Sequence, residues 1–162
     1  QPMSVVIYNK KLDTWGPGAH AGTFRGNQLA MVAGTVVMER LKSPGFLEAV
    51  IRKGDKFRSR MEALKAECPI IGDVRGKGLM LGIEFVDPNG PVDIMGHPME
   101  SGTICARVQK ECFENHLVME KGGRNGSTMR CLTALNISDE DLETGIRILE
   151  KVVRNINKEY VK

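Results

Sequence analysis

The chain has 162 residues and a formal charge of +3, and 41% of its residues are hydrophobic and 27% charged. This composition predicts a packed core and excludes a disordered chain, and the length suffices for one domain or one domain with an arm. The sequence contains no run of about 18 apolar residues, which excludes a membrane span. Aromatic residues make up only 5%, and the charge is small, so nucleic acid is not expected as a partner.

The four cysteines form no CxxC pair; they are Cys68, Cys105, Cys112 and Cys131. We therefore expect buried or half-buried reduced thiols in place of disulfides or zinc ligands, and no bound metal. The N-terminus has no basic segment followed by an apolar run, so no signal peptide is expected. These features together predict a cytoplasmic protein.

The first 41 residues combine a short apolar run with a long polar loop. Residues 4–8 are apolar and β-branched, which predicts a buried strand. Residues 9–27 are rich in glycine and turn-forming residues, and a loop of this length inside a compact domain is usually functional or disordered. Residues 28–41 repeat apolar side chains at three- and four-residue spacing, which predicts a helix.

A second helix is predicted after Ser43 and Pro44, which suit an N-cap and a first helical position. It extends to about residue 66 and carries six apolar residues on one face: Leu47, Val50, Ile51, Phe57, Met61 and Leu64. The opposite face is rich in lysine and arginine. Because acidic residues interrupt it, we interpret this face as solvated in preference to a polyanion site.

From residue 70 the apolar period changes to two, which predicts an antiparallel hairpin of strands 70–75 and 79–85 with a turn at 76–78. A surface loop at 87–98 and a helix at 101–115 follow. Short strands are predicted at 117–119 and 128–133, and Ser138 opens a final helix. A hairpin with helices on one side gives an α+β fold with a short antiparallel sheet.

The glycine-rich loop carries the first candidate site. A loop that enters a helix N-terminus offers free N–H groups and the positive end of the helix dipole to an anion. Thr23 adds a hydroxyl and Arg25 a positive charge. A purely structural turn with Asn27 as N-cap explains the spacing equally well, because glycine-rich loops alone are weak evidence.

Arg130 is the second candidate, because it lies between Met129 and Cys131 in an apolar strand. A carboxylate or phosphate partner would offset the desolvation of its guanidinium, whereas an edge strand would leave it facing solvent. Arg75 and Glu84 lie on paired strands and are interpreted as a cross-strand ion pair. His97 and His116 have no neighbours at metal-ligand spacing.

Three segments together resemble the class III aminotransferases, which are pyridoxal-phosphate enzymes of fold type I. Residues 18–30 read Gly-Ala-His-Ala-Gly-Thr-Phe-Arg-Gly-Asn-Gln-Leu-Ala, residues 74–84 read Val-Arg-Gly-Lys-Gly-Leu-Met-Leu-Gly-Ile-Glu, and residues 129–132 read Met-Arg-Cys-Leu. The resemblance extends along essentially the whole chain. Within the family, the form of the first segment is most similar to that of the diaminobutyrate–2-oxoglutarate transaminases.

The resemblance implies a role for each candidate residue. Thr23 matches the threonine that contacts the cofactor phosphate of the partner subunit in a homodimer, and Arg130 matches the arginine that binds the substrate α-carboxylate. Residues 1–41 would then be a strand-loop-helix remnant of the large domain, and residues 42–162 the C-terminal small domain. The implied substrates are an amino acid, 2,4-diaminobutyrate by the nearest match, and 2-oxoglutarate.

The chain departs from the family pattern in two respects. The family has Pro-Pro-Leu shortly after the arginine, where this chain has Thr133, Ala134 and Leu135. The Schiff-base lysine of the family lies upstream of residues 4–8, so no catalytic residue is assigned here and the chain alone is expected to be inactive.

Two alternatives remain open at this point. One is a different class III specificity, of the ornithine, acetylornithine or 4-aminobutyrate type. The other is a non-enzymatic α+β module that binds a phosphorylated ligand through the loop at 18–27.

Overall fold

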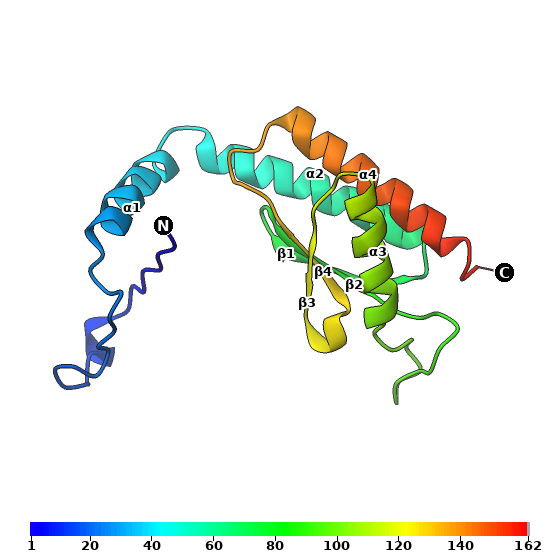
Figure 1. Ribbon diagram of the computed structural model, residues 1–162, viewed down its shortest axis with the longest axis horizontal. Coiled ribbons are helices and arrows are strands. Elements are labelled where there is room, and N and C mark those ends of the chain that lie inside the picture. The colour runs from blue at the N-terminus through cyan, green and yellow to red at the C-terminus, as the bar shows by residue number, and fades with distance from the viewer. Residues whose placement is uncertain (162) are drawn as a thin grey trace. The chain divides into compact units, whose positions relative to one another are not determined.

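The computed structural model describes residues 1–161 (Figure 1). The chain divides into two compact units, Gln1–Leu47 and Glu48–Lys162. Within residues 1–161, no helix combines the length and the apolar character needed to cross a membrane.

The first unit contains one α-helix, α1, at Gln28–Leu41, as the apolar spacing predicts. Asn27 caps this helix, because its side chain accepts a hydrogen bond of 3.0 Å from the Ala30 N–H. A 3₁₀ turn at Lys10–Leu12 precedes it, and of the residues in this unit only Ala30 is buried. Apart from Ala30 and the half-buried Leu41, the apolar side chains of α1 are therefore exposed in the unit as described.

The strand predicted at 4–8 is absent. Residues 1–9 have no regular secondary structure, and Val6 and Ile7 are 78% and 90% exposed. A strand exists only where a neighbouring strand accepts its backbone hydrogen bonds, and the first unit holds no strand to serve as that neighbour. An apolar, β-branched composition is therefore insufficient to form one here.

The second unit contains a four-stranded antiparallel sheet in the order β1-β2-β4-β3. The strands are β1 at Ile71–Lys77, β2 at Met80–Phe85, β3 at Glu120–Gly122 and β4 at Thr128–Leu132. Alternate residues of β2 are buried, namely Leu81, Ile83 and Phe85, whereas Met80 is 63% exposed. One face of the sheet is therefore covered and the other is open, and the α+β fold is confirmed.

The strand boundaries differ from the predicted ones at two places. Lys77 pairs with Met80, so the hairpin turn consists of Gly78 and Leu79, and the strand continues through Gly76. Gly76 has φ +139°, and a Cβ there would lie 2.1 Å from the Met80 carbonyl oxygen, so no other residue fits without distortion. Residues 117–119 are not a strand, because β3 begins only at Glu120.

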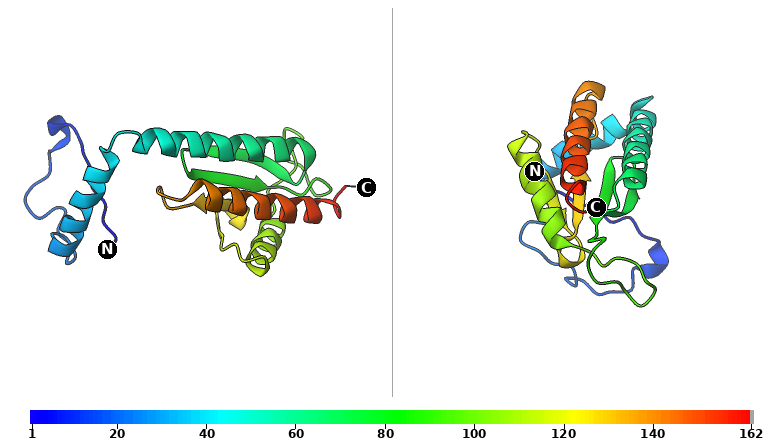
Figure 2. Two further views of the ribbon diagram at one scale, coloured as in Figure 1. Left: turned by 90° about the horizontal axis from the view of Figure 1, so that it is seen from above. Right: turned by 90° about the vertical axis from the view of Figure 1, so that its right-hand side faces the viewer.

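Three helices complete the second unit: α2 at Phe46–Glu67, α3 at Gly102–Glu114 and α4 at Asp139–Asn157. Ser101 and Ser138 cap α3 and α4 through their hydroxyl oxygens, which accept backbone N–H bonds. Figure 2 shows α2 and α4 running alongside each other with the strands along them. The apolar faces of α2 and α4 form the core together with the covered face of the sheet. Leu47 and Ile51, which were predicted to lie on the apolar face of α2, are about half exposed.

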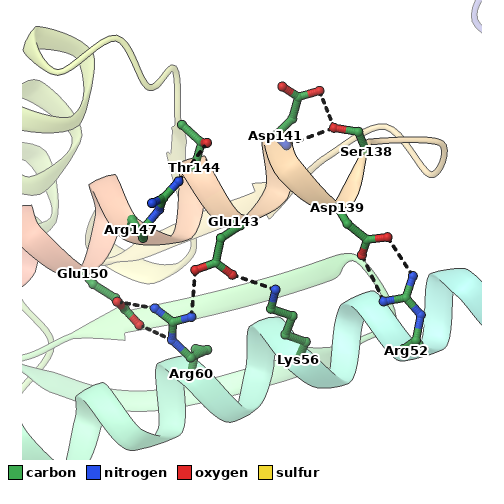
Figure 3. A network of polar contacts seen from close by, with 10 residues as sticks. All are labelled: Arg52, Lys56, Arg60, Ser138, Asp139, Asp141, Glu143, Thr144, Arg147 and Glu150. Atoms are coloured by element: carbon green, nitrogen blue, oxygen red, sulfur yellow. Dashed lines mark hydrogen bonds and ion pairs between the residues drawn. The ribbon is translucent and has the colours of Figure 1, made fainter.

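The basic face of α2 is not simply solvated, because α4 supplies carboxylates along it (Figure 3). Arg52 pairs with Asp139 at 2.9 Å, and Lys56 pairs with Glu143 at 2.6 Å. Arg60 donates two hydrogen bonds of 2.7 Å to Glu150, whose side chain is only 9% exposed. We call these six residues the α2–α4 ion ladder. The interpretation of this face as solvated is therefore incomplete, because three of its cations pair with carboxylates of α4.

All four cysteines are free and buried, as the sequence predicts. Burial raises the pKa of Cys105 to about 11, and that of Cys112 and of Cys131 to about 12. These thiols are therefore protonated core residues at neutral pH.

Candidate functional site

Arg130 lies in β4, between β2 and β3, opposite Gly82 and Glu120. The edge-strand interpretation is therefore wrong, because β1 and β3 form the edges. Arg130 nevertheless reaches solvent, since alternate residues of β4 point to the open face and its side chain is 47% exposed. An arginine is tolerated in this interior strand because only one face of the sheet is covered.

Within the described part of the chain, the guanidinium of Arg130 has one carboxylate partner, Glu120, with Nη1 and Oε1 at 3.2 Å. Glu120 is itself 63% exposed, so the pair is a weak surface interaction that another carboxylate can displace. Beside it, a Cβ on Gly122 would lie 3.0 Å from Cδ of Arg130, so the absence of a side chain at Gly122 makes room for the arginine. Sequence reasoning missed both neighbours, because only the register of β3 places them beside Arg130.

A second charged cluster lies on the open face. Arg75 binds Asp73 at 2.9 Å and Glu84 at 2.8 Å, which confirms the predicted cross-strand ion pair. Both carboxylates, Asp73 first, raise the pKa of the Arg75 guanidinium. With two carboxylates already bound, Arg75 is less available to a ligand than Arg130 is.

Thr23 lies in the first unit, at the second position of a turn closed by the bond from Arg25 N–H to the Gly22 carbonyl at 3.1 Å. The Thr23 side chain is exposed, and its hydroxyl makes no hydrogen bond within residues 1–161. Asn27 caps the helix as the structural-turn interpretation predicts, but Thr23 contributes nothing to that turn through its hydroxyl. Its hydroxyl is free to bind a ligand.

The surroundings of Thr23 fit an anion. The backbone N–H groups of Gln28 and Leu29, at the start of α1, have no acceptor among the described residues. Arg25 has no carboxylate partner there either, and its Cγ lies 3.3 Å from the position of a Cβ on Gly22. A hydroxyl, free N–H groups and a positive charge are the donors that a phosphate monoester requires.

An aromatic cluster supports the same loop. The rings of Tyr8 and Trp15 lie 5.2 Å apart, and the His20 ring meets Trp15 edge-on at 4.6 Å. These contacts hold residues 8–20 against one another in a segment with little other packing. Thr23 and Arg130 lie in different units, so each site stands on its own geometry.

The comparison with known families decides which family the chain belongs to. The family described as aminotransferase class III matches residues 2–153. The chain belongs to the class III aminotransferases. Members of this family depend on pyridoxal phosphate, whose phosphate group suits the donors around Thr23.

Two relatives of this aminotransferase chain carry the same substrate name. A diaminobutyrate–2-oxoglutarate aminotransferase of Rhizobium meliloti is 47% identical over 88% of this chain and 30% of its own length. One of Haemophilus influenzae is 37% identical over 94% of this chain and 34% of its own length. The chain therefore spans about a third of the length of the relatives it matches.

Solved aminotransferases share the fold. An aminotransferase of Bacillus anthracis superimposes with a TM-score of 0.69, 26% identity, and coverage of 85% of this chain and 30% of its own. Acetylornithine aminotransferase of Elizabethkingia anophelis superimposes with a TM-score of 0.67 and 29% identity, and the match covers 88% of this chain and 34% of that protein. These matches place the α+β unit within the pyridoxal-phosphate aminotransferase architecture.

Proposed function

We propose that this chain is the part of a class III aminotransferase that binds the substrate carboxylate and contacts the cofactor phosphate. The whole enzyme would transfer an amino group between 2,4-diaminobutyrate and 2-oxoglutarate. The names of the relatives support these substrates. The observation that carries the proposal is Arg130, whose only carboxylate partner among residues 1–161 is the exposed, displaceable Glu120.

In this proposal residues 1–41 belong to the large domain and residues 42–162 form the small domain. Arg130 binds the α-carboxylate that both substrates present, and the planar guanidinium suits this task because it pairs with a carboxylate through two parallel hydrogen bonds. Glu120 holds the guanidinium until the substrate arrives. Thr23 and the N-terminus of α1 hold the cofactor phosphate of the partner subunit in a homodimer.

Pyridoxal phosphate, when bound, supplies the electron sink for amino transfer. The residues of this chain supply binding and orientation. The 162-residue chain alone is expected to show no transaminase activity, because no residue in it is assigned the role of the Schiff-base lysine. Turnover of diaminobutyrate by the purified chain would contradict this assignment.

The Arg130 role is tested in the full-length enzyme with Arg130→Ala and Arg130→Lys. Loss of a charge-assisted, two-bond contact costs about 2–5 kcal/mol, so kcat/KM should fall by about 30- to 5000-fold for both substrates in the alanine variant. Arg130→Lys should retain only part of the wild-type kcat/KM, because an ammonium cannot reproduce the planar two-bond contact. Arg124→Ala is the matched control, since Arg124 is 88% exposed and pairs with Glu100. Unchanged kinetics for Arg130→Ala would move the carboxylate site elsewhere.

The Thr23 role is tested by cofactor retention in Thr23→Ala and Thr23→Ser. A hydroxyl bonded to a phosphate contributes roughly 1.5–3 kcal/mol, so the dissociation constant of pyridoxal phosphate should rise about ten- to a hundredfold in the alanine variant. Serine should retain the wild-type value. The melting temperature should fall only for the cofactor-loaded form, and an equal fall without cofactor would show that Thr23 merely supports the loop.

A further inference from the structure

A cleft of about 480 Å³ lies inside the second unit, separate from the Thr23 loop. Its wall is mostly apolar and comes from α2, α4 and the segments on either side of β3 and β4. The apolar side chains that line it include Phe57, Leu117, Ile137, Leu142, Ile146 and Leu149. This volume lies within the range of small-molecule sites, about 300–1,000 Å³.

The cleft exists because β3 is short. Glu120 pairs with Arg130, and continuing that register would bring Met119 opposite Cys131 and Val118 opposite Leu132. Residues 117–119 do not pair with β4, so a slot remains between these two segments, with α4 behind it. On α4, Gly145 leaves further space, since a Cβ there would meet only Leu117 Cδ1, at 3.6 Å.

Thr133 supplies a second observation that points to a ligand. It lines the cleft, and its hydroxyl oxygen is buried without any hydrogen-bond partner among residues 1–161. Buried polar groups are nearly always paired, so this hydroxyl is available to a polar group of a molecule bound in the cleft.

The charges around the cleft favour a neutral occupant. Arg130 at its edge is compensated by Glu120, and the Asp141 carboxylate accepts a hydrogen bond from the Ser138 hydroxyl at 2.7 Å. One arginine and two carboxylates line this edge, so the net charge there is negative. A carboxylate ligand would therefore be repelled unless it displaced Glu120.

We propose that this cleft binds a small neutral molecule that is largely apolar and carries one hydroxyl or carbonyl group, which hydrogen-bonds Thr133. The occupant lies against Cys131 and Leu132, directly after Arg130 in β4. The cleft adjoins the proposed carboxylate site, because Arg130 and Glu120 line one of its edges, and its binding of a neutral molecule can be measured without catalysis.

The test uses three matched probes, 4-fluorobenzyl alcohol, 4-fluorotoluene and 4-fluorobenzoate, titrated into the purified protein and followed by ¹⁹F NMR. The alcohol should bind saturably and about two- to tenfold more tightly than the toluene, as one neutral hydrogen bond predicts. In Arg130→Ala, which lacks the proposed carboxylate site, the benzoate should bind least. Absence of saturable binding of both neutral probes, or tightest binding of the benzoate in Arg130→Ala, would overturn the proposal.

Two variants locate the site. Gly145→Met fills the cleft from α4 and should abolish binding, whereas Thr144→Met adds the same side chain at the adjacent exposed position and should leave it unchanged. Thr133→Val should retain the toluene and remove the preference for the alcohol. Wild-type affinities in folded Gly145→Met, or an undiminished alcohol preference in Thr133→Val, would show that the probes bind elsewhere.

Discussion

Gly54 lies in the middle of α2, a position where glycine ordinarily weakens a helix. The close approach of the turn between β1 and β2 explains why glycine stands at this position. A Cβ on Gly54 would lie 2.3 Å from the carbonyl oxygen of Gly78, in the turn between β1 and β2. The missing side chain therefore lets α2 pack directly against the hairpin backbone.

Gly54→Ala is expected to destabilise the protein. Overpacking against backbone costs about 3 kcal/mol at the upper end of its usual range, which exceeds the gain of about 1 kcal/mol in helix propensity. Gly145→Ala is the control, because its Cβ meets only ordinary contacts, and it should stabilise by about 0.5–1 kcal/mol. Urea unfolding measures both, and a stabilising Gly54→Ala would contradict the close approach.

The buried cysteines give a second prediction at this scale. Because burial raises the pKa of Cys105, Cys112 and Cys131 to about 11, 12 and 12, almost no thiolate is present at pH 8. In the folded protein these thiols should react with a chromogenic disulfide reagent only at the rate of unfolding. Rapid stoichiometric labelling in native buffer, matching that in denaturant, would refute their placement in the core.

Among the elements, the α2–α4 ion ladder links two helices that are distant in sequence. The Lys56 ammonium and then the Arg60 guanidinium lower the pKa of Glu143, and Arg52 lowers that of Asp139. A carboxylate with a lowered pKa stabilises the fold when ionised. That contribution is complete above its ordinary pKa near 4.5 and is lost as pH falls through the lower folded value.

Glu143→Gln should therefore lower the melting temperature at pH 7, and the difference from wild type should shrink steadily below about pH 5. Glu140→Gln is the control, since Glu140 lies exposed on the same helix without an ion pair in the described chain. Calorimetry between pH 3 and 7 measures the melting temperatures of both variants and of the wild type. A difference that is undiminished at pH 3 would mean that packing, and not charge, accounts for the Glu143 contribution.

The elements were predictable where local pattern decides the structure. Apolar spacing predicted α1 and α4, and alternation predicted β2 and the antiparallel hairpin. The strand at 4–8 and the strand at 117–119 were wrong because pairing partners, which composition does not encode, determine strands. The ion ladder and the contact of Glu120 with Arg130 were not predictable either, since each depends on the tertiary register of segments far apart in the chain.

At the scale of the whole molecule, the two units differ in how their backbone is protected. The loop at 9–27 is exposed throughout and contains three tryptic sites, after Lys10, Lys11 and Arg25. The second unit buries its helices and strands around a continuous core. Accessible, weakly bonded segments open most readily and are cleaved first.

Limited trypsin digestion of the chain should therefore cut within residues 9–27 before it cuts within residues 48–161, as read by mass spectrometry. The intact second unit should remain as the long-lived product. Earlier cleavage within α2 or α4 would contradict this order. If the homodimer proposal is correct, assembly of the full-length enzyme should protect the Thr23 loop, because the partner subunit and cofactor then cover it.

The ion ladder also has a consequence for how the chain is made. Arg52 and Asp139 are 87 residues apart, and Arg60 and Glu150 are 90 apart. A ribosome releases α2 with its cations unsatisfied long before α4 emerges, and closing so long a loop slows the first productive encounter. The second unit should therefore complete its fold only once nearly all of it has been synthesised, and a chain stalled before residue 139 should remain a substrate for chaperones.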